Sequence, residues 1–285
     1  SAEDMPLLEI VGHPRPLNPD IKLSGIAFEN GWPLYRFDEG NRNGILNILR
    51  TGLAAGTLVP AALRGITTGA LSLSWRDGVN SMMATVGDLG AMMAGIQLLV
   101  KGEGNLWSHR PAVFTFNHQS SADLIIVAKL LRKDARAIAK KSLQYAPILG
   151  QLMMAAGIIF IDRGNREKAI EAMKPAVDAL TEGTSIAIAP EGTRSVDYTL
   201  GRFKKGAFHL AMQAKVPIVP IVILNAHDAM PKGTNVFKPS VIEVVVLDPI
   251  ATHHWKAEEL DDRIREVRNA YLRELGQEEE PLLLN

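Results

Sequence analysis

The chain has 285 residues, of which 47% are hydrophobic, and its formal net charge is +0. This length allows one large domain, or one domain with a smaller attachment. The neutral balance argues against a dedicated nucleic-acid-binding protein, and the absence of cysteine excludes disulfides, thiolate nucleophiles and cysteine-based metal sites.

Residues 1–43 are rich in Pro, Gly and Asn and contain two short apolar patches. A segment of this length cannot build a hydrophobic core of its own. We therefore expect it to be a linker or an attachment to the rest of the chain.

Residues 44–95 are apolar, rich in small residues and almost without acidic ones. A membrane-spanning helix needs about 20 consecutive apolar residues, but Arg50, Pro60 and Arg64 interrupt this stretch. The pattern favours a hairpin of two helices that docks in one leaflet, with the arginine side chains reaching the lipid headgroups. A helical hairpin packed on a soluble body fits the same residues.

Residues 96–250 alternate between apolar runs and helical patterns, which is typical of an α/β fold. We predict a mostly parallel sheet of about seven strands flanked by helices, preceded by the apolar helical hairpin. The predicted strands are 96–101, 112–117, 136–139, 157–162, 185–189, 217–223 and 240–247. The predicted helices are 122–133, 142–155, 166–181, 204–214 and 256–275.

Ligands of such sheets bind at the carboxyl ends of the strands, so the residues that follow the strands are candidates for a site. His118 follows the second predicted strand, and Asp123 begins the next helix. A carboxylate five residues away can hold one imidazole nitrogen, which leaves the other free to take a proton from a hydroxyl. The alternative is a helix N-cap beside an incidental histidine.

Ser120 and Ser121 are possible nucleophiles, which would make the protein a hydrolase. Neither lies in G-x-S-x-G, the turn that exposes a catalytic serine, and N-capping is an ordinary role for serine at this position. The hydroxyl that reacts is therefore expected to belong to the substrate.

Basic side chains follow other strands of the sheet. Arg163 and Arg194 each end a different strand region, and their planar donor forks suit a phosphate or carboxylate. Each could instead pair with a neighbouring acid, Asp162 or Glu191. Together, beside a base, they favour a phosphate site.

Four sequence blocks carry a family resemblance. They are "NHQSSAD" (117–123), "GIIFIDR" (157–163), "PEGTRS" (190–195) and "VPIVPI" (216–221), in that order. They resemble the H-x4-D blocks of the glycerolipid acyltransferase family, which acylates glycerol-3-phosphate and 1-acylglycerol-3-phosphate. The match spans roughly residues 96–250.

The resemblance implies a role for each matching residue. It implies His118 as general base with Asp123 as its partner, and a wall of the acceptor site formed by Glu191, Gly192 and Thr193. The implied ligands of the acceptor phosphate are Arg163, Arg194, Lys140, Lys141 and Lys204. It also implies an acyl-CoA or acyl-carrier-protein donor, no cofactor and no metal.

The first 40 residues, from "SAEDMPLLEIVGHPRPLNPD" onward, resemble the final segment of a haloacid-dehalogenase-type phosphatase domain. Asp4 would match the last metal-binding acid of that fold, but one acidic ligand does not make a magnesium site. We interpret 1–43 as the remnant of an upstream domain in a covalent fusion, 44–95 as the docking hairpin and 96–285 as the acyltransferase domain.

The sequence thus predicts a 1-acylglycerol-3-phosphate O-acyltransferase of phospholipid biosynthesis. Its partners would be lysophosphatidic acid, acyl-CoA and a membrane surface with anionic lipids, and not nucleic acid. It would be peripheral or monotopic on the cytoplasmic face of the cell membrane. Three alternatives remain: a glycerol-3-phosphate acyltransferase, a serine lipid hydrolase and a non-catalytic lipid-binding module.

Overall fold

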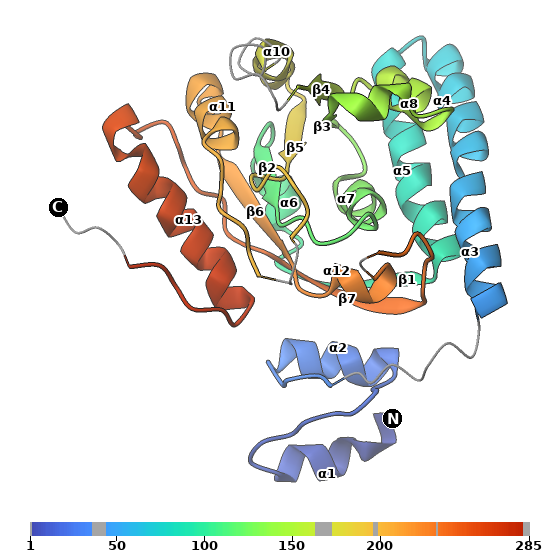
Figure 1. Ribbon diagram of the computed structural model, residues 1–285, viewed down its shortest axis with the longest axis vertical. Helices are drawn as coiled ribbons and strands as arrows, with labels where there is room; N and C mark the ends of the chain where they lie inside the picture. The colour runs from blue at the N-terminus through green and yellow to red at the C-terminus, as the bar shows by residue number, and fades with distance from the viewer. Residues whose placement is uncertain (1, 36–43, 163–172, 196–198, 232, 282–285) are drawn as a thin grey trace.

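The computed structural model describes residues 2–35, 44–162, 173–195, 199–231 and 233–281 (Figure 1). Within these ranges the centre of the molecule is a seven-stranded sheet in the order β1-β7-β6-β2-β5-β3-β4. The strands are β1 (Ile96–Lys101), β2 (Val113–Phe116), β3 (Ala135–Lys140), β4 (Ile159–Ile161), β5 (Ser185–Ile188), β6 (Ile218–Ile223) and β7 (Ser240–Val246). All seven predicted strands are present, so the predicted fold class is confirmed.

Neighbouring strands pair in parallel except β6 and β7, which are antiparallel. Strands β2 to β6 therefore run in one direction, and their carboxyl ends meet at a single edge of the sheet. We call this the catalytic edge. It brings together the residues after β2, β3, β4 and β5, as the sequence predicts.

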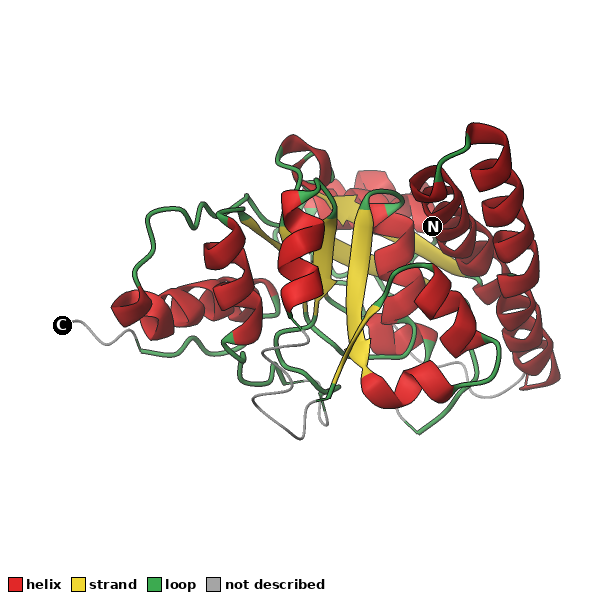
Figure 2. Cartoon of the chain, turned by 90° about the horizontal axis from the view of Figure 1, so that it is seen from above, coloured by secondary structure: helices red, strands yellow, loops and turns green. Residues whose placement is uncertain are grey.

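Two hydrophobic cores lie on opposite faces of the sheet because adjacent residues of a buried strand point to opposite sides. Phe114 and Val219 belong to the core beneath α5 and α7, whereas Val113 and Ile218 belong to the core beneath α10, α11 and α13. Figure 2 shows the sheet enclosed between these helices. The bounds are α5 (Trp75–Ala94), α6 (Asn105–Ser108), α7 (Asp123–Leu131), α8 (Leu149–Ala155), α10 (Lys174–Thr181), α11 (Gly206–Ala214), α12 (Ala226–Ala229) and α13 (Leu260–Glu274).

The predicted helix 142–155 is wrong in one respect, because it is two elements. A 3-10 helix, η2 (Lys141–Tyr145), is followed by α8, and the break lies at Pro147. The residue before a proline avoids the helical region, and Ala146 is extended. For the predicted helix 166–181, α10 confirms the C-terminal part, and residues 166–172 lie outside the described residues.

At the N-terminus, short helices η1 (Ala2–Asp4) and α1 (Met5–Ile10) precede α2 (Ile21–Glu29). Helix α2 buries Leu23 and Ala27 and packs against β1 and β7 at the end of the sheet. The origin of residues 1–43 as part of an upstream domain stays a prediction.

Residues 44–95 form a helical hairpin, as predicted. Helices α3 (Gly44–Gly56) and α4 (Leu58–Ser72) follow one another along one arm, and α5 is the other. Glycines allow the arms to approach closely: a Cβ added to Gly78 would lie 2.7 Å from the carbonyl oxygen of Gly65. At Gly87, α5 in turn meets the backbone of α7, where an added Cβ would lie 2.5 Å from the Cα of Lys129.

We expected Arg50 and Arg64 to reach outward to lipid headgroups, and this expectation is wrong. Arg64 Nη1 donates to Thr85 Oγ1 of α5 at 3.4 Å, and Arg50 lies against Gly95, where an added Cβ would be 3.1 Å from its Nε. Arg76 binds Asp134 of the body at 2.6 Å. Arg50 is half-buried, and each of the two hairpin arginines donates a hydrogen bond within the hairpin, Arg50 Nη1 to Asn47 Oδ1 at 2.7 Å and Arg64 to Thr85. Helices α3 and α4 carry no other charged residue.

We predict that Gly87→Ala lowers the free energy of unfolding by about 1–3 kcal/mol, because a methyl group there must push α5 away from the α7 backbone. The control is Gly52→Ala in α3, where an added Cβ meets no atom within 4 Å. It should raise that free energy by about 0.5–1 kcal/mol. Chemical denaturation measures both, and equal effects of the two substitutions would contradict the close packing.

Candidate active site

The turn after β2 brings His118 and Asp123 into direct contact. The Nδ1 of His118 lies 2.7 Å from Oδ2 of Asp123. An ionised carboxylate only accepts hydrogen bonds, so it holds the hydrogen on Nδ1. The side chain of His118 is 29% exposed, and its Nε2 has no hydrogen-bond partner among the described residues. The free nitrogen can therefore receive a proton from a bound substrate.

Asp123 is the first residue of α7 and is 1% exposed. Its Oδ2 also accepts the backbone amides of Gln119 and Ser120, each at 3.0 Å, so a single oxygen fixes both the ring and the turn. Burial raises the pKa of the Asp123 carboxyl above its usual range, and the hydrogen bond from His118 opposes this rise.

A second buried carboxylate, Glu191, lies in the turn after β5 and binds the same His118 turn. Its Oε1 accepts the backbone amide of His118 at 2.7 Å, and its Oε2 accepts the amide of Gly201 at 2.8 Å. Burial raises the pKa of Glu191 too, opposed by these two amides. Both carboxylate oxygens are thus occupied by protein groups, and the expected contact of Glu191 with the acceptor stays a prediction.

Asn117 is a supporting residue that sequence reasoning missed. Its buried side-chain amide donates to the carbonyl of Ile223 at 2.8 Å and accepts the amide of the same residue at 2.7 Å. It thereby continues the β2–β6 pairing past the end of β2. Its position directly after a buried strand was the available signal.

The serines of the turn have structural partners. Ser120 is buried, and its hydroxyl donates to the carbonyl of Met230 at 3.0 Å and accepts the amide of Ala122 at 3.2 Å. Ser121 Oγ accepts from Arg194 Nη1 at 2.7 Å. Within the described part of the chain neither hydroxyl bonds to His118, which disfavours the serine-hydrolase alternative.

The structure brings some of the predicted phosphate ligands next to this turn. Arg194 reaches it through Ser121, and Lys204 lies over Gly192, where an added Cβ would be 2.9 Å from Nζ. Gly192 has a φ of +72°, which suits glycine. Thr193, Arg194 and Lys204 are exposed.

Two predicted ligands lie further along the catalytic edge. Lys140 and Lys141 are exposed at the end of β3, which is two strands from β2 in the sheet. Arg163 lies outside the described residues. Among the residues that the structure describes, no three His, Asp or Glu side chains are arranged to hold a metal ion.

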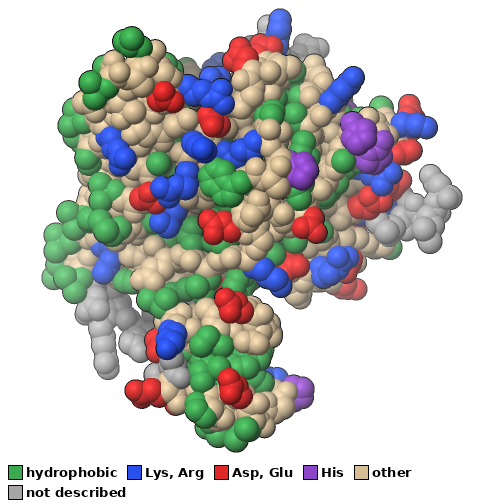
Figure 3. All heavy atoms as spheres, turned by 180° about the vertical axis from the view of Figure 1, so that it is seen from behind, with side chains coloured by type: hydrophobic (Ala, Val, Ile, Leu, Met, Phe, Trp, Pro, Cys, Tyr) green, Lys and Arg blue, Asp and Glu red, His purple; other side chains and the backbone are tan. Residues whose placement is uncertain are grey.

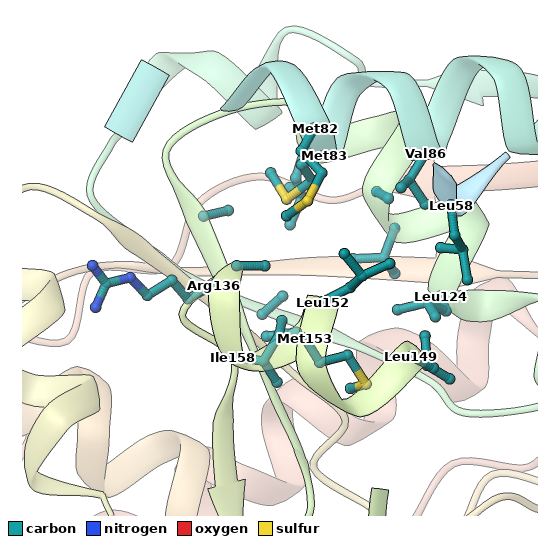
Figure 4. A pocket seen from close by; sticks show the side chains of 17 residues that line it. Leu58, Met82, Met83, Val86, Leu124, Arg136, Leu149, Leu152, Met153 and Ile158 are labelled. Carbon is teal, nitrogen blue, oxygen red and sulfur yellow. The ribbon is translucent and has the colours of Figure 1, made fainter. Parts of the chain in front are cut away.

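An apolar channel runs along α7, between this helix and α4, α5, β3 and α8 (Figure 4). Leu124, the neighbour of Asp123, lines one end, and Arg136 and Ile158 line the other. The walls come from α4, α5, α7, β3 and α8 and include Leu58, Met82, Met83, Val86, Leu149, Leu152 and Met153. The channel has a cavity volume of about 100 Å³ and an almost wholly apolar lining, so it suits part of a hydrocarbon chain.

Comparisons with known proteins identify the family of this chain. A family profile described as "Acyltransferase" matches residues 97–224. The 1-acyl-sn-glycerol-3-phosphate acyltransferase of Limnanthes douglasii is 38% identical over 198 residues, which cover 69% of this chain and 70% of that protein. The chain belongs to the acyltransferase family.

Further relatives of this acyltransferase carry the same name. The 1-acyl-sn-glycerol-3-phosphate acyltransferase of Saccharomyces cerevisiae is 35% identical over 191 residues, covering 65% of this chain and 63% of that protein. The human alpha form is 37% identical over 186 residues, covering 64% and 66%. The crystal structure of the 1-acyl-sn-glycerophosphate acyltransferase PlsC from Thermotoga maritima shares the fold, with a TM-score of 0.66 at 22% identity over 82% of this chain and 96% of that one.

We predict that Asp123→Asn lowers kcat on the order of 10⁴-fold, the size of loss that follows when a base loses its orienting carboxylate, and yet stabilises the fold at neutral pH. Because the folded pKa of this acid is raised, the folded chain loses stability relative to the unfolded chain as the pH rises from the ordinary Asp value through the folded pKa. Asparagine avoids that cost and keeps an oxygen for the two amides.

The control is Asp88→Asn, because the hydrogen bond from Arg132 lowers the pKa of Asp88. This half-exposed pair should stabilise the fold slightly at neutral pH, so its loss should lower the melting temperature a little and leave kcat unchanged. Thermal unfolding between pH 4 and 8 checks both signs. A large loss of stability in Asp123→Asn would contradict the assignment.

Proposed function

We propose that this protein transfers an acyl chain from a thioester donor to the sn-2 hydroxyl of 1-acylglycerol-3-phosphate, giving phosphatidic acid. The observation that carries the proposal is the His118–Asp123 contact of 2.7 Å, with Nε2 free, beside an apolar channel. The relatives named 1-acyl-sn-glycerol-3-phosphate acyltransferase, at 35–38% identity, support this acceptor.

In the proposed step the acceptor hydroxyl oxygen attacks the thioester carbonyl carbon while its proton passes to Nε2 of His118. The tetrahedral intermediate collapses, the carbon–sulfur bond breaks, and the thiolate leaves and takes the proton from the imidazolium. Asp123 holds the ring in the correct tautomer and stabilises the imidazolium between the two transfers. Acyl-CoA and acyl-carrier protein both supply such a thioester.

The acceptor phosphate would bind the cations of the catalytic edge. Arg194 and Lys204 adjoin the His118 turn, and Lys140 and Lys141 extend the same edge. Arginine can bind a phosphate through two parallel N–H bonds, and lysine as a point charge. A glycerol-3-phosphate acceptor would bind the same cations through its phosphate. A preference for 1-acylglycerol-3-phosphate must therefore come from apolar contacts with its acyl chain.

We expect the purified protein to convert 1-acylglycerol-3-phosphate and labelled acyl-CoA into a product with the mass of phosphatidic acid. A lyso-lipid without the phosphate should be a poor acceptor, and glycerol-3-phosphate should be poorer than 1-acylglycerol-3-phosphate. His118→Ala should lower kcat by at least 10³-fold with unchanged circular dichroism. Full activity of His118→Ala, or an acylated protein trapped in place of product, would overturn the mechanism.

Membrane docking by the hairpin is the second part of the proposal. Helices α3 and α4 together run over Gly44–Ser72, 29 residues that are long and apolar enough to cross a membrane by length and composition. Their outer face exposes Ile45, Leu46, Ile48, Leu49, Leu53, Val59, Leu63 and Ile66, and Figure 3 shows hydrophobic side chains gathered over this part of the molecule. With Arg50 and Arg64 turned inward, an uncharged surface faces the lipid.

This face would place the channel beside lipid, since Leu58 of α4 and Met82, Met83 and Val86 of α5 line its wall. A lipid acceptor and a fatty acyl group could then reach the catalytic edge without crossing water. One leaflet is sufficient for this arrangement.

We predict that the double substitution Ile48→Glu with Leu63→Glu abolishes co-sedimentation with phosphatidylcholine vesicles, because two charges interrupt the apolar face. The control is Leu7→Glu with Ile10→Glu in α1, where the replaced side chains are at least as exposed, at 62% and 79% against 61% for Ile48 and 60% for Leu63. Binding should change little between low and high salt, because the face has no charged groups. Equal loss in both double variants would contradict docking through the hairpin.

A further inference from the structure

We propose that Arg268, on the C-terminal helix α13, is a positioning residue for His118. The inference rests on the proposed function, because it assigns His118 the role of base. It concerns a chain of hydrogen bonds that starts in α13 and ends at the backbone of the histidine.

The middle of this chain of hydrogen bonds is the dipeptide Leu200–Gly201. Side chains of the C-terminal region bind three of its four backbone polar groups. Arg268 Nη2 donates to the carbonyl of Leu200 at 2.5 Å, and Arg268 Nε donates to the carbonyl of Gly201 at 2.9 Å. The Leu200 amide donates to Oε1 of Gln277 at 2.9 Å.

The fourth group, the amide of Gly201, donates to Oε2 of Glu191 at 2.8 Å. This amide and the carbonyl of Leu200 belong to the same peptide unit. Arg268 therefore holds one end of a peptide plane whose other end holds Glu191. A cation at the carbonyl polarises the peptide and strengthens the bond that its N–H makes.

Glu191 passes the constraint to the site. Its Oε1 accepts the amide of His118 at 2.7 Å, so the order is Arg268, peptide 200–201, Glu191, His118. Gly201 and the Glu191 carboxylate are closely packed, because a Cβ added to Gly201 would lie 2.8 Å from Oε2 of Glu191. The carboxylate is 4% exposed, so no water can easily replace a lost donor.

Arg268 is itself held in place. Its side chain is 12% exposed, and Nη1 lies 2.8 Å from Oε1 of Glu280. The side-chain amide of Asn269 holds the backbone of Glu280: it donates to the carbonyl at 2.8 Å and accepts from the amide at 2.9 Å. Three residues further along α13, the Tyr271 hydroxyl contacts Thr115 Oγ1 of β2 at 2.9 Å. Helix α13 thus supports the end of β2 from two directions.

If Arg268 is lost, the carbonyls of Leu200 and Gly201 lose their donors, and among the side chains of the C-terminal region only Gln277 still holds this dipeptide. One oxygen of the buried Glu191 carboxylate then depends on a less restrained peptide, and the turn that carries His118 can shift. A misplacement of about 1 Å at a reacting group can cost on the order of 10²-fold in rate. Substrate contacts are untouched, so the loss should fall on kcat and not on KM.

The test compares Arg268→Gln with Arg273→Gln on the same helix. Arg273 is also paired with an acid of the C-terminal segment, Glu279, but is 65% exposed and reaches no part of the site. We expect Arg268→Gln to lower kcat about 10- to 100-fold, with KM for both substrates changed less than about twofold. Arg273→Gln should match the wild type.

Arg268→Lys keeps the charge but cannot bind both carbonyls with a planar guanidinium, so its kcat should lie between those of Arg268→Gln and the wild type. This variant replaces Arg268→Gln in the test if the glutamine variant does not fold. Hydrogen exchange of the peptide containing 117–119 supplies a readout that needs no activity, and it should be faster in Arg268→Gln than in Arg273→Gln. Unchanged exchange and kcat in a folded Arg268 variant, or equal losses in the Arg273 variant, would overturn the inference.

These readouts separate the two proposals. A wild-type protein without acyltransferase activity would refute the proposed function, while exchange at 117–119 would still report the link between Arg268 and the turn. An active wild type with an unaffected Arg268→Gln variant would refute the link alone.

Discussion

Two buried carboxylates hold one turn, and the site depends on this constraint. Asp123 fixes the imidazole of His118 and the amides that follow it, whereas Glu191 fixes the amide of His118 itself. Asp123 lies at the start of α7 and Glu191 in the turn after β5, so the His118 turn has this geometry only when the sheet and α7 are both correctly packed. The position of the proposed base is thereby set by the fold and not by the local H-x4-D sequence alone.

The hairpin and the channel depend on the same helix. Helix α7 carries Asp123 at its first turn and lines the channel along its length. It also contacts the backbone of α5, where Gly87 packs against Lys129. A displacement of the hairpin would therefore move the channel wall and the orienting carboxylate together. Beside this backbone contact, Asp88 of α5 also pairs with Lys129 at 3.2 Å and with Arg132 at 2.7 Å, so the two helices are joined by packing and by charge.

The sequence predicts the fold well because every strand is mostly apolar and helical patterns separate most of the strands. His118 and Asp123 could be paired because both belong to one turn. Contacts between different segments could not be predicted. The sequence predicts that Glu191 faces the substrate, but nothing in its pattern shows that the Gly201 amide, ten residues away, binds this carboxylate. The inward direction of Arg64 was missed for the same reason, because its partner Thr85 lies 21 residues away.

The arrangement of charge gives these constraints a chemical consequence. The charge of Asp123 contributes to the raised pKa of Glu191, so the two carboxylates repel each other in a buried region, and proximity to His118 acts in the opposite direction. A neutral imidazole leaves that repulsion uncompensated. In the proposed step, the positive charge that His118 gains is stabilised by its hydrogen bond to Asp123 and by the nearby Glu191 carboxylate. Groups that are fixed in advance where charge develops lower a barrier without reorganisation.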